Sequence, residues 1–370
     1  MSDNNELDEI DFDSLDFEIE KFKFDVIIGN PPYQEEAKGD STSTAPIYHR
    51  FMEEAYKIAK RVAFITPARF LFNAGQTPKK WNKKMLDDEH LRVEFYEPDS
   101  SKVFANTNIV GGVAVTYRDA EKNFGAIGQF ITVTELRSIA DKVKGIDTTS
   151  SLSDIAYART SYKLTNKLHT EHPDAKKLLS EGHAFDVSTN VFDSLSYLFF
   201  DTKPTDVTND YIRIYGIQNN KRVSKWINCE YIDTHPNLHK HKVFQGKSNG
   251  ASGTFASIPA RMITPPVVMP PGVGHTQTFM SFGAFDTEHE AQSTAKYIKT
   301  KFTRSLLGIL KVTQDNPVNT WSFVPIQNFT TSSDIDWTKS IPEIDQQLYA
   351  KYNLDDTEIA FIESHIEEMA

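Results

Sequence analysis

The chain has 370 residues, 39% of them hydrophobic and 12% aromatic, which is enough apolar material for two folded domains. Its one cysteine, Cys229, excludes an intramolecular disulfide framework and a zinc site built from cysteines. The sequence shows no secretory signal and no apolar run long enough to span a membrane. We therefore expect a soluble, cytoplasmic protein.

The net charge of −11 is concentrated at the start of the chain. The first 20 residues hold nine Asp or Glu and no Lys or Arg, so the other 350 residues carry only −2. We expect residues 1–22 to form an acidic, partly disordered leader, with a contact to a basic partner as the alternative. Residues 238–312 hold nine Lys or Arg against three acidic residues, which predicts that this window faces phosphates.

The first folded segment in chain order, residues 24–33, is an apolar run that ends in Asn30-Pro31-Pro32-Tyr33. Residues 26–28 are β-branched and adjacent, which is typical of a strand buried on both faces of a parallel sheet. The two prolines cannot continue the hydrogen-bond ladder, so the chain leaves the sheet here as a stiff loop. Open α/β sheets bind ligands at this carboxyl end of their strands.

The residue types of the tetrapeptide suit an extruded nucleobase. The Asn30 side chain and the Pro31 carbonyl offer two acceptors for the hydrogens of an exocyclic amine, which leaves the nitrogen lone pair free to attack a methyl donor. Tyr33 offers a flat face that can stack on the base. The alternative without catalysis is a proline-terminated strand followed by a loop tyrosine.

Placed after such a strand, the tetrapeptide resembles the Asn-Pro-Pro-Tyr motif of S-adenosylmethionine-dependent amino methyltransferases, above all the DNA adenine-N6 methyltransferases of bacterial restriction-modification systems. The resemblance implies S-adenosyl-L-methionine as cofactor, double-stranded DNA as partner and a flipped adenine as substrate. It also implies that Asn30, Pro31, Pro32 and Tyr33 are catalytic and that no metal takes part. Glutamine methyltransferases share the motif, so protein or RNA amino methylation is an alternative.

The following segments extend this resemblance to residue 118. A helix opened by Pro46 and a strand at residues 62–65 predict a parallel strand-helix-strand unit, and strands at residues 93–96 and 110–117 resemble the reversed hairpin of the methyltransferase sheet. We therefore assign residues 23–120 to a catalytic half-domain. By the same resemblance, Tyr48 and Phe51 lie beside the cofactor, and Phe104 is a second aromatic contact to the target base. A core phenylalanine is the alternative for Phe104.

Residues 121–185 have the character of a helical connector, and residues 186–330 hold short strand-like runs separated by Gly, Asn and Pro. One capping box, at residues 287–290, predicts a helix to about residue 311, and a second, at residues 340–343, predicts two short helices within residues 331–370. The stretch 301–369, which includes Thr313-Gln314-Asp315-Asn316 and Phe323-Val324-Pro325, resembles the carboxyl-terminal part of restriction-system methyltransferases with a built-in target-recognition domain. The predicted fold is a partial class I, Rossmann-like α/β methyltransferase sheet followed by an α+β target-recognition domain at residues 186–330.

The basic window supplies the residues predicted to bind DNA, with a solvated surface as the alternative for each of them. They are Lys247, Lys296, Lys299, Lys301 and Arg304.

The glycine-rich cofactor loop of this family has no clear counterpart in the sequence. Only 29 residues precede Asn30, too few for three strand-helix units, and the glycines at 125–128 and 272–274 do not lie between a strand and a helix. We therefore expect a partner protein to supply the cofactor lobe, and any nuclease as well. A truncated enzyme and a non-catalytic DNA-recognition subunit are the alternatives.

Overall fold

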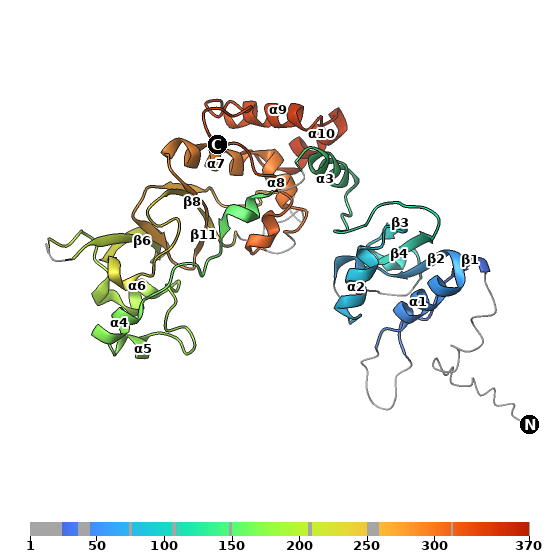
Figure 1. Cartoon of the computed structure of the whole chain (residues 1–370), viewed down its shortest axis with the longest axis horizontal. Coiled ribbons are helices and arrows are strands. Elements are labelled where there is room, and N and C mark those ends of the chain that lie inside the picture. Colours follow the sequence, from blue (N-terminus) through green and yellow to red (C-terminus); the bar gives the residue numbers. More distant parts are fainter. Residues whose placement is uncertain are drawn as a thin grey trace, which may run out of the picture. The chain divides into compact units, whose positions relative to one another are not determined.

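The computed structural model describes residues 24–35, 45–73, 76–105, 109, 111–147, 150–205, 209–249, 259–311 and 314–369. Contacts divide the chain into two compact units, Met1–Thr132 and Val133–Ala370 (Figure 1). Residues up to 132 belong to the first unit because Ile127 and Phe130 pack on its core. The predicted acidic leader lies outside the described residues.

The first unit is built on a four-stranded sheet in the order β1-β2-β4-β3. Strands β1 and β2 are parallel and are joined by helix α1, whereas β4 runs antiparallel to both β2 and β3. This arrangement confirms the predicted strand-helix-strand unit and the reversed hairpin. The elements are β1 (Phe24–Gly29), α1 (Tyr48–Ile58), β2 (Ala59–Pro67), α2 (Lys79–Leu86), β3 (Leu91–Glu97) and β4 (Val113–Asp119).

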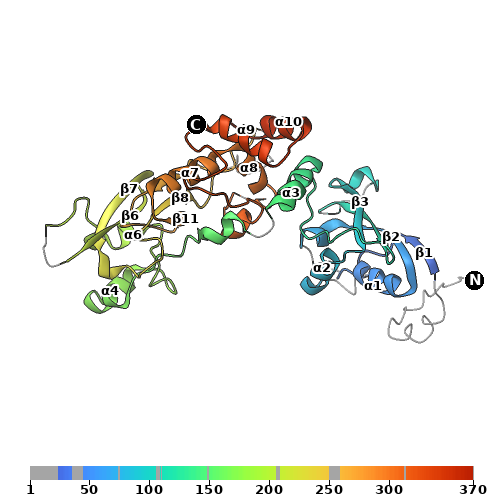
Figure 2. The same cartoon turned by 45° about the horizontal axis from the view of Figure 1, so that its top comes forward.

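The core of the first unit packs α1 and α2 against one face of this sheet, and Figure 2 draws both helices below the strands. Met52 of α1, Phe64 of β2 and Trp81 of α2 are buried in it. Phe51 of α1 is only half-buried. The side of α1 that faces the sheet carries its three buried residues, Tyr48, Met52 and Ala55.

The predicted burial of β1 on both faces is wrong. Within the described residues β1 pairs only with β2, so its other edge is open. Alternate side chains of a strand share a face, and on one face of β1 Phe24, Val26 and Ile28 are 49%, 46% and 79% exposed. Ile27, on the opposite face, packs on the core. The apolar run of β1 is therefore packed against the core only on the face of Ile27.

The second unit contains two further sheets, in the orders β10-β6-β7 and β5-β11-β8-β9. Its strands are β5 (Ala156–Tyr157), β6 (Tyr211–Gln218), β7 (Lys221–Asn228), β8 (His241–Gly246), β9 (Val267–Met269), β10 (Val273–His275) and β11 (Phe279–Phe285). Its helices are α3 (Thr134–Ile146), α4 (Asn166–Glu171), α5 (Ala175–Leu178), α6 (Val191–Ser194), α7 (Glu288–Lys299), α8 (Lys301–Leu307), α9 (Ile341–Lys351) and α10 (Asp356–His365).

Residues 156–185, which the sequence assigns to a connector, take part in the core of the second unit. Tyr162, Leu164 and Leu168 are buried there together with Ile212 of β6 and Ile227 of β7. The finer division of this unit into a connector, a recognition domain and a helical end stays a prediction. None of the helices in the described part of the chain is both long and apolar enough to cross a membrane.

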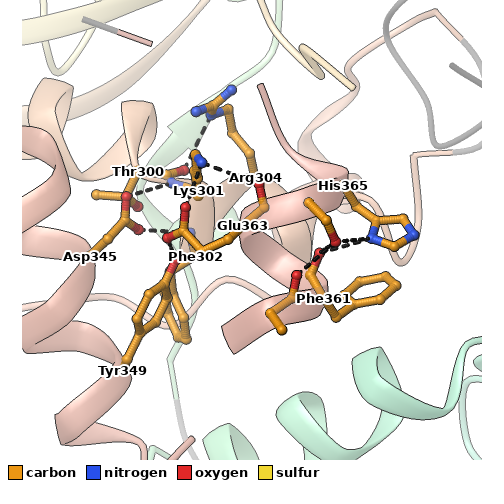
Figure 3. A network of polar contacts seen from close by, with 11 residues as sticks. Thr300, Lys301, Phe302, Arg304, Asp345, Tyr349, Phe361, Glu363 and His365 are labelled. Carbon is orange, nitrogen blue, oxygen red and sulfur yellow. Dashed lines mark hydrogen bonds and ion pairs between the residues drawn. The ribbon is translucent and has the colours of Figure 1, made fainter. Parts of the chain in front are cut away.

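The single helix predicted for residues 287–311 is in fact two helices, α7 and α8, that meet at Thr300. Thr300 has an extended ψ of 149°, and its side chain accepts the N–H of Thr303 and so caps α8. The carboxylate of Asp345 accepts the N–H groups of Lys301 and Phe302 at 3.0 and 2.9 Å (Figure 3). These acceptors satisfy the first N–H groups of α8 and allow the chain to change direction.

Asp345 gives the second unit a testable pH dependence. Burial raises the pKa of Asp345 from 3.8 to about 7. Between these values the folded protein holds a proton on Asp345 that the unfolded chain has lost, so the contribution of Asp345 to the free energy of unfolding falls as the pH rises and levels off above pH 7. We expect a decrease of roughly 1–4 kcal/mol. Urea unfolding of the wild type and of Asp345→Asn over this pH range tests this: the free energy of unfolding of the wild type minus that of the variant should fall by this amount, and a constant difference would contradict it.

Candidate functional site

The tetrapeptide lies at the carboxyl end of β1, as the sequence predicts. Gly29 is the last residue of β1 that pairs with β2, opposite Phe64, and residues 30–33 follow outside the sheet. The Tyr33 carbonyl accepts the N–H of Ile47 at 3.2 Å, and the next residue, Gln34, forms an isolated bridge with Pro46. These contacts attach the loop to the residues that precede α1.

Tyr33 and Phe104 lie side by side, although they are far apart in the sequence. Their ring centroids are 6.4 Å apart, and the rings meet edge to face at 69°. Both side chains are half-buried. Phe104 is held by a short turn in which its N–H donates to the Ser100 carbonyl at 2.8 Å. The structure thus brings together the two residues that the sequence predicts to contact the base.

Asn30 and Pro31 differ in their exposure. The Pro31 side chain is buried and anchors the loop, whereas Asn30 is exposed and its amide makes no hydrogen bond within the described residues. The amide oxygen of Asn30 is therefore available to a donor on a ligand. An oriented loop with a free acceptor at a strand end is the arrangement that amine recognition requires.

The Tyr33 hydroxyl is buried and has no hydrogen-bond partner. Burial raises the pKa of Tyr33 to about 12, so the hydroxyl stays protonated at neutral pH. It can neither remove a proton from a substrate amine nor act as a charged group. The predicted role of Tyr33, stacking on a target base, therefore depends on its ring and not on its hydroxyl.

This assignment predicts a clear difference between two Tyr33 variants. Tyr33→Phe keeps the ring and removes an unpaired hydroxyl, so DNA methylation should stay within about threefold of the wild type. Tyr33→Ala removes the stacking face and should lower the rate by about 10- to 100-fold, because stacking one base on an aromatic ring stabilises a complex by roughly 1–3 kcal/mol. Initial rates measured at equal protein concentration test this; an equal loss in both variants would assign the role to the hydroxyl.

The two residues predicted to lie beside the cofactor offer little surface to a ligand. Tyr48 is 3% exposed, and its ring packs edge to face on Trp81 at 6.1 Å. Burial raises the pKa of Tyr48 to about 12. Phe51 is half-buried. Within the described residues no glycine-rich turn lies between a strand and a helix, and the predicted second lobe for the cofactor stays a prediction.

Two of the lysines predicted to bind DNA make contacts inside the second unit. Lys296 donates to the carbonyls of Trp337 and Lys339 at 2.7 and 2.9 Å, and Lys301 pairs with Glu363 at 2.6 Å (Figure 3). These contacts connect α7 and α8 to the C-terminal segments. The sequence predicts an exposed basic surface here, but the two ammonium groups already serve as internal hydrogen-bond donors.

Arg304 departs furthest from its predicted role. Its side chain is fully buried, and its Nε donates to the carbonyls of Lys299 and Thr300 at 3.0 and 3.2 Å. The guanidinium thus donates to carbonyl groups at the end of α7, where the helix leaves carbonyls without intrahelical donors; the Thr300 carbonyl also accepts the backbone N–H of Arg304. Arg304 is therefore not placed to contact DNA, and Lys299, which is half-buried, lies at the same helix end. A charge count along the sequence cannot show that a basic side chain is buried and hydrogen-bonded to the backbone.

Lys247 is the exception among the five. Its ammonium group has no ion pair or hydrogen bond within the described residues, and it lines a cavity together with Arg159. Arg159 lies far from the basic window, in a segment of the sequence that gives no other signal of binding. Within the described residues no three His, Cys, Asp or Glu side chains lie together as they would around a metal ion.

Residues 1–104 match the family model of the Eco57I restriction-modification methylases. The matched range contains the tetrapeptide, Tyr48, Phe51 and Phe104, so the part of the chain that holds the candidate site is similar to restriction-modification methylases. No curated protein matches the chain.

Two solved structures of restriction-modification enzymes are also similar to the chain. The type IIG restriction endonuclease BpuSI gives a TM-score of 0.31 at 10% identity, covering 93% of this chain and 53% of its own. The type IIL restriction-modification enzyme MmeI, solved in complex with DNA, gives a TM-score of 0.33 at 10% identity, covering 96% of this chain and 57% of its own. The chain thus spans little more than half the length of either enzyme. TM-scores this low do not establish a common fold.

Proposed function

We propose that this chain is the target-binding part of a site-specific DNA adenine-N6 methyltransferase of a restriction-modification system. The observation that carries the proposal is the loop of residues 30–33 at the carboxyl end of β1, with Tyr33 beside Phe104, inside the segment that matches restriction-modification methylases. The substrate is an adenine flipped out of double-stranded DNA. The methyl group comes from S-adenosyl-L-methionine, which is the electrophile of the reaction.

The residues of this chain act on the base that accepts the methyl group. The Asn30 oxygen and the Pro31 carbonyl accept the two hydrogens of the N6 amine, which directs its lone pair away from the loop. Tyr33 stacks on the adenine, and Phe104, whose ring meets that of Tyr33 edge to face, is a second aromatic contact to the base. Positioning of the amine supplies most of the acceleration, because no covalent bond forms between the base and the protein.

We propose that a further α/β lobe holds the methyl donor, since the described residues contain no glycine-rich turn between a strand and a helix. The open edge of β1 supports this requirement: parallel strands normally lie inside sheets with both faces covered, and exposed edge strands tend to pair with another chain segment. The uncovered Phe24, Val26 and Ile28 add an apolar surface beside that edge. We propose that the donor lobe adds a strand along β1 and covers these side chains.

The direct test uses tritiated S-adenosylmethionine and mixed-sequence duplex DNA, with and without the product of the neighbouring upstream gene. The DNA is digested, and label is sought in N6-methyladenine. Label that appears only when both proteins are present is the expected result. Label in another base, in RNA or in protein would refute the adenine assignment, and label with this chain alone would refute the need for a second lobe.

The second candidate is a DNA-recognition subunit without catalysis of its own. It is favoured by the incomplete donor site within the described residues and by the size of the second unit, residues 133–370. This candidate predicts salt-sensitive DNA binding with no label transferred under any of the conditions above.

A further inference from the structure

The second unit contains a cavity that none of the catalytic residues lines. Its volume is about 850 Å³, and it lies between the turn after β5, the end of β8, β11 and the segment before the short 3-10 helix Val318–Trp321. Lys247 comes from the end of β8 and Arg159 from the turn after β5. A cavity of this volume falls in the range that holds small ligands or one nucleotide.

The two cations of this cavity are free, in contrast to those of α7 and α8. Neither Arg159 nor Lys247 has an ion pair or a hydrogen bond from its side chain within the described residues. The carboxylate in the lining, Asp315, interacts with the nearby Lys311. The cavity therefore keeps two cationic groups without anionic partners, which favours binding of an anion.

Asn316 adds a buried donor that also lacks a partner. The residue is 3% exposed, its Oδ1 accepts from the Thr320 hydroxyl at 3.3 Å, and its Nδ2 makes no hydrogen bond. Its backbone N–H donates to the Lys247 carbonyl at 2.7 Å, so Asn316 and Lys247 are held next to each other. Buried amide groups rarely remain unpaired, and such a group beside two free cations indicates a ligand with acceptor oxygens.

The rest of the lining is apolar and suits the non-ionic part of such a ligand. Met280, Pro317 and Val318 supply this wall. Phosphate oxygens match the donors, and a sugar or base matches the apolar side. A simple inorganic anion would leave most of the volume empty.

We propose that this cavity binds one nucleotide unit of a DNA strand, with its phosphate between Arg159 and Lys247 and in reach of the Asn316 amide. This proposal rests on the proposed function, because it takes DNA as the ligand. It assigns the DNA contact of the second unit to this cavity and not to α7 and α8, whose cations are internally bonded.

The test measures binding of the full chain to a fluorescent duplex by anisotropy over a series of salt concentrations. We compare the wild type with Arg159→Ala, Lys247→Ala and the matched control Lys176→Ala, which removes an exposed lysine of α5 in the same unit. Each cavity variant should bind about tenfold more weakly. Its plot of log affinity against log salt should be shallower by about 1. The control should bind like the wild type, and equal melting temperatures establish that all variants fold.

The outcomes separate this inference from the function on which it rests. DNA binding by the wild type with no difference between the cavity variants and the control overturns the cavity assignment and leaves the proposed function standing. No DNA binding by the wild type overturns the proposed DNA interface, and the cavity assignment with it. Displacement of the duplex from the wild type by free deoxyadenosine monophosphate, at concentrations without effect on Lys247→Ala, identifies a free nucleotide as the ligand and overturns the assignment to DNA.

Discussion

An Asn30→Ala protein should methylate DNA about 10²–10³-fold more slowly than the wild type, the loss typical of removing one oriented polar group from a reacting centre. The variant lacks the side-chain acceptor for the N6 amine, so the amine can rotate and its lone pair no longer points consistently at the methyl donor. Folding should not change, because the Asn30 side chain is exposed and makes no hydrogen bond within the described residues.

The matched control for this experiment is Asn30→Asp, which keeps an acceptor oxygen and removes the amide donor. We expect Asn30→Asp to retain part of the activity and to fall between the wild type and Asn30→Ala. Initial rates of N6-methyladenine formation are measured with the protein that completes the donor site, together with melting temperatures and DNA affinity. Wild-type rates in the Asn30→Ala protein would exclude the proposed role of the tetrapeptide.

The local geometry of the site could be predicted from the sequence because proline and strand patterns act over a few residues. Pro31 and Pro32 end β1 where the pattern places its end, and α1 begins close after Pro46. The pairing of Tyr33 with Phe104 followed from a family resemblance and not from periodicity, since no local pattern relates two residues so far apart. The sequence predicted the capping boxes at Thr287 and Ser340 correctly, because each depends on residues only three positions apart.

The predictions that were wrong concern burial, which depends on the segments that pack against a strand or helix in the folded protein. The sequence of β1 has the composition of a central strand, but its neighbours in space decide whether it is buried, and here Ile28 is 79% exposed. Arg304 appears as a surface cation in a charge count, although backbone carbonyls from α7 bind it in the interior. Arg159 gives no signal at all, because only the fold brings it to the same cavity as Lys247.

The apolar composition of β1 is explained if the proposed donor lobe covers its exposed side chains. A charged substitution on this strand should then strongly weaken binding of that lobe. Ile28→Asp should leave the melting temperature of the isolated chain nearly unchanged, because surface substitutions usually alter the free energy of unfolding by less than about 0.5 kcal/mol. It should nevertheless reduce association with the donor lobe, and methylation with it, by about 100-fold or more, because an unpaired carboxylate buried in an apolar interface costs several kcal/mol.

Phe95→Asp is the matched control, because Phe95 is an apolar side chain, 48% exposed, on β3 at the other edge of the same sheet. If the donor lobe adds a strand at β1, the charge on β3 should weaken association much less than the charge on β1. Association is measured by titrating the purified chain with the protein that restores methylation. Equal losses of association from both substitutions would indicate that the lobe contacts both edges of the sheet. No loss from Ile28→Asp would show that the lobe does not bind at β1. The exposed apolar side chains of β1 would then not form the proposed contact with the donor lobe.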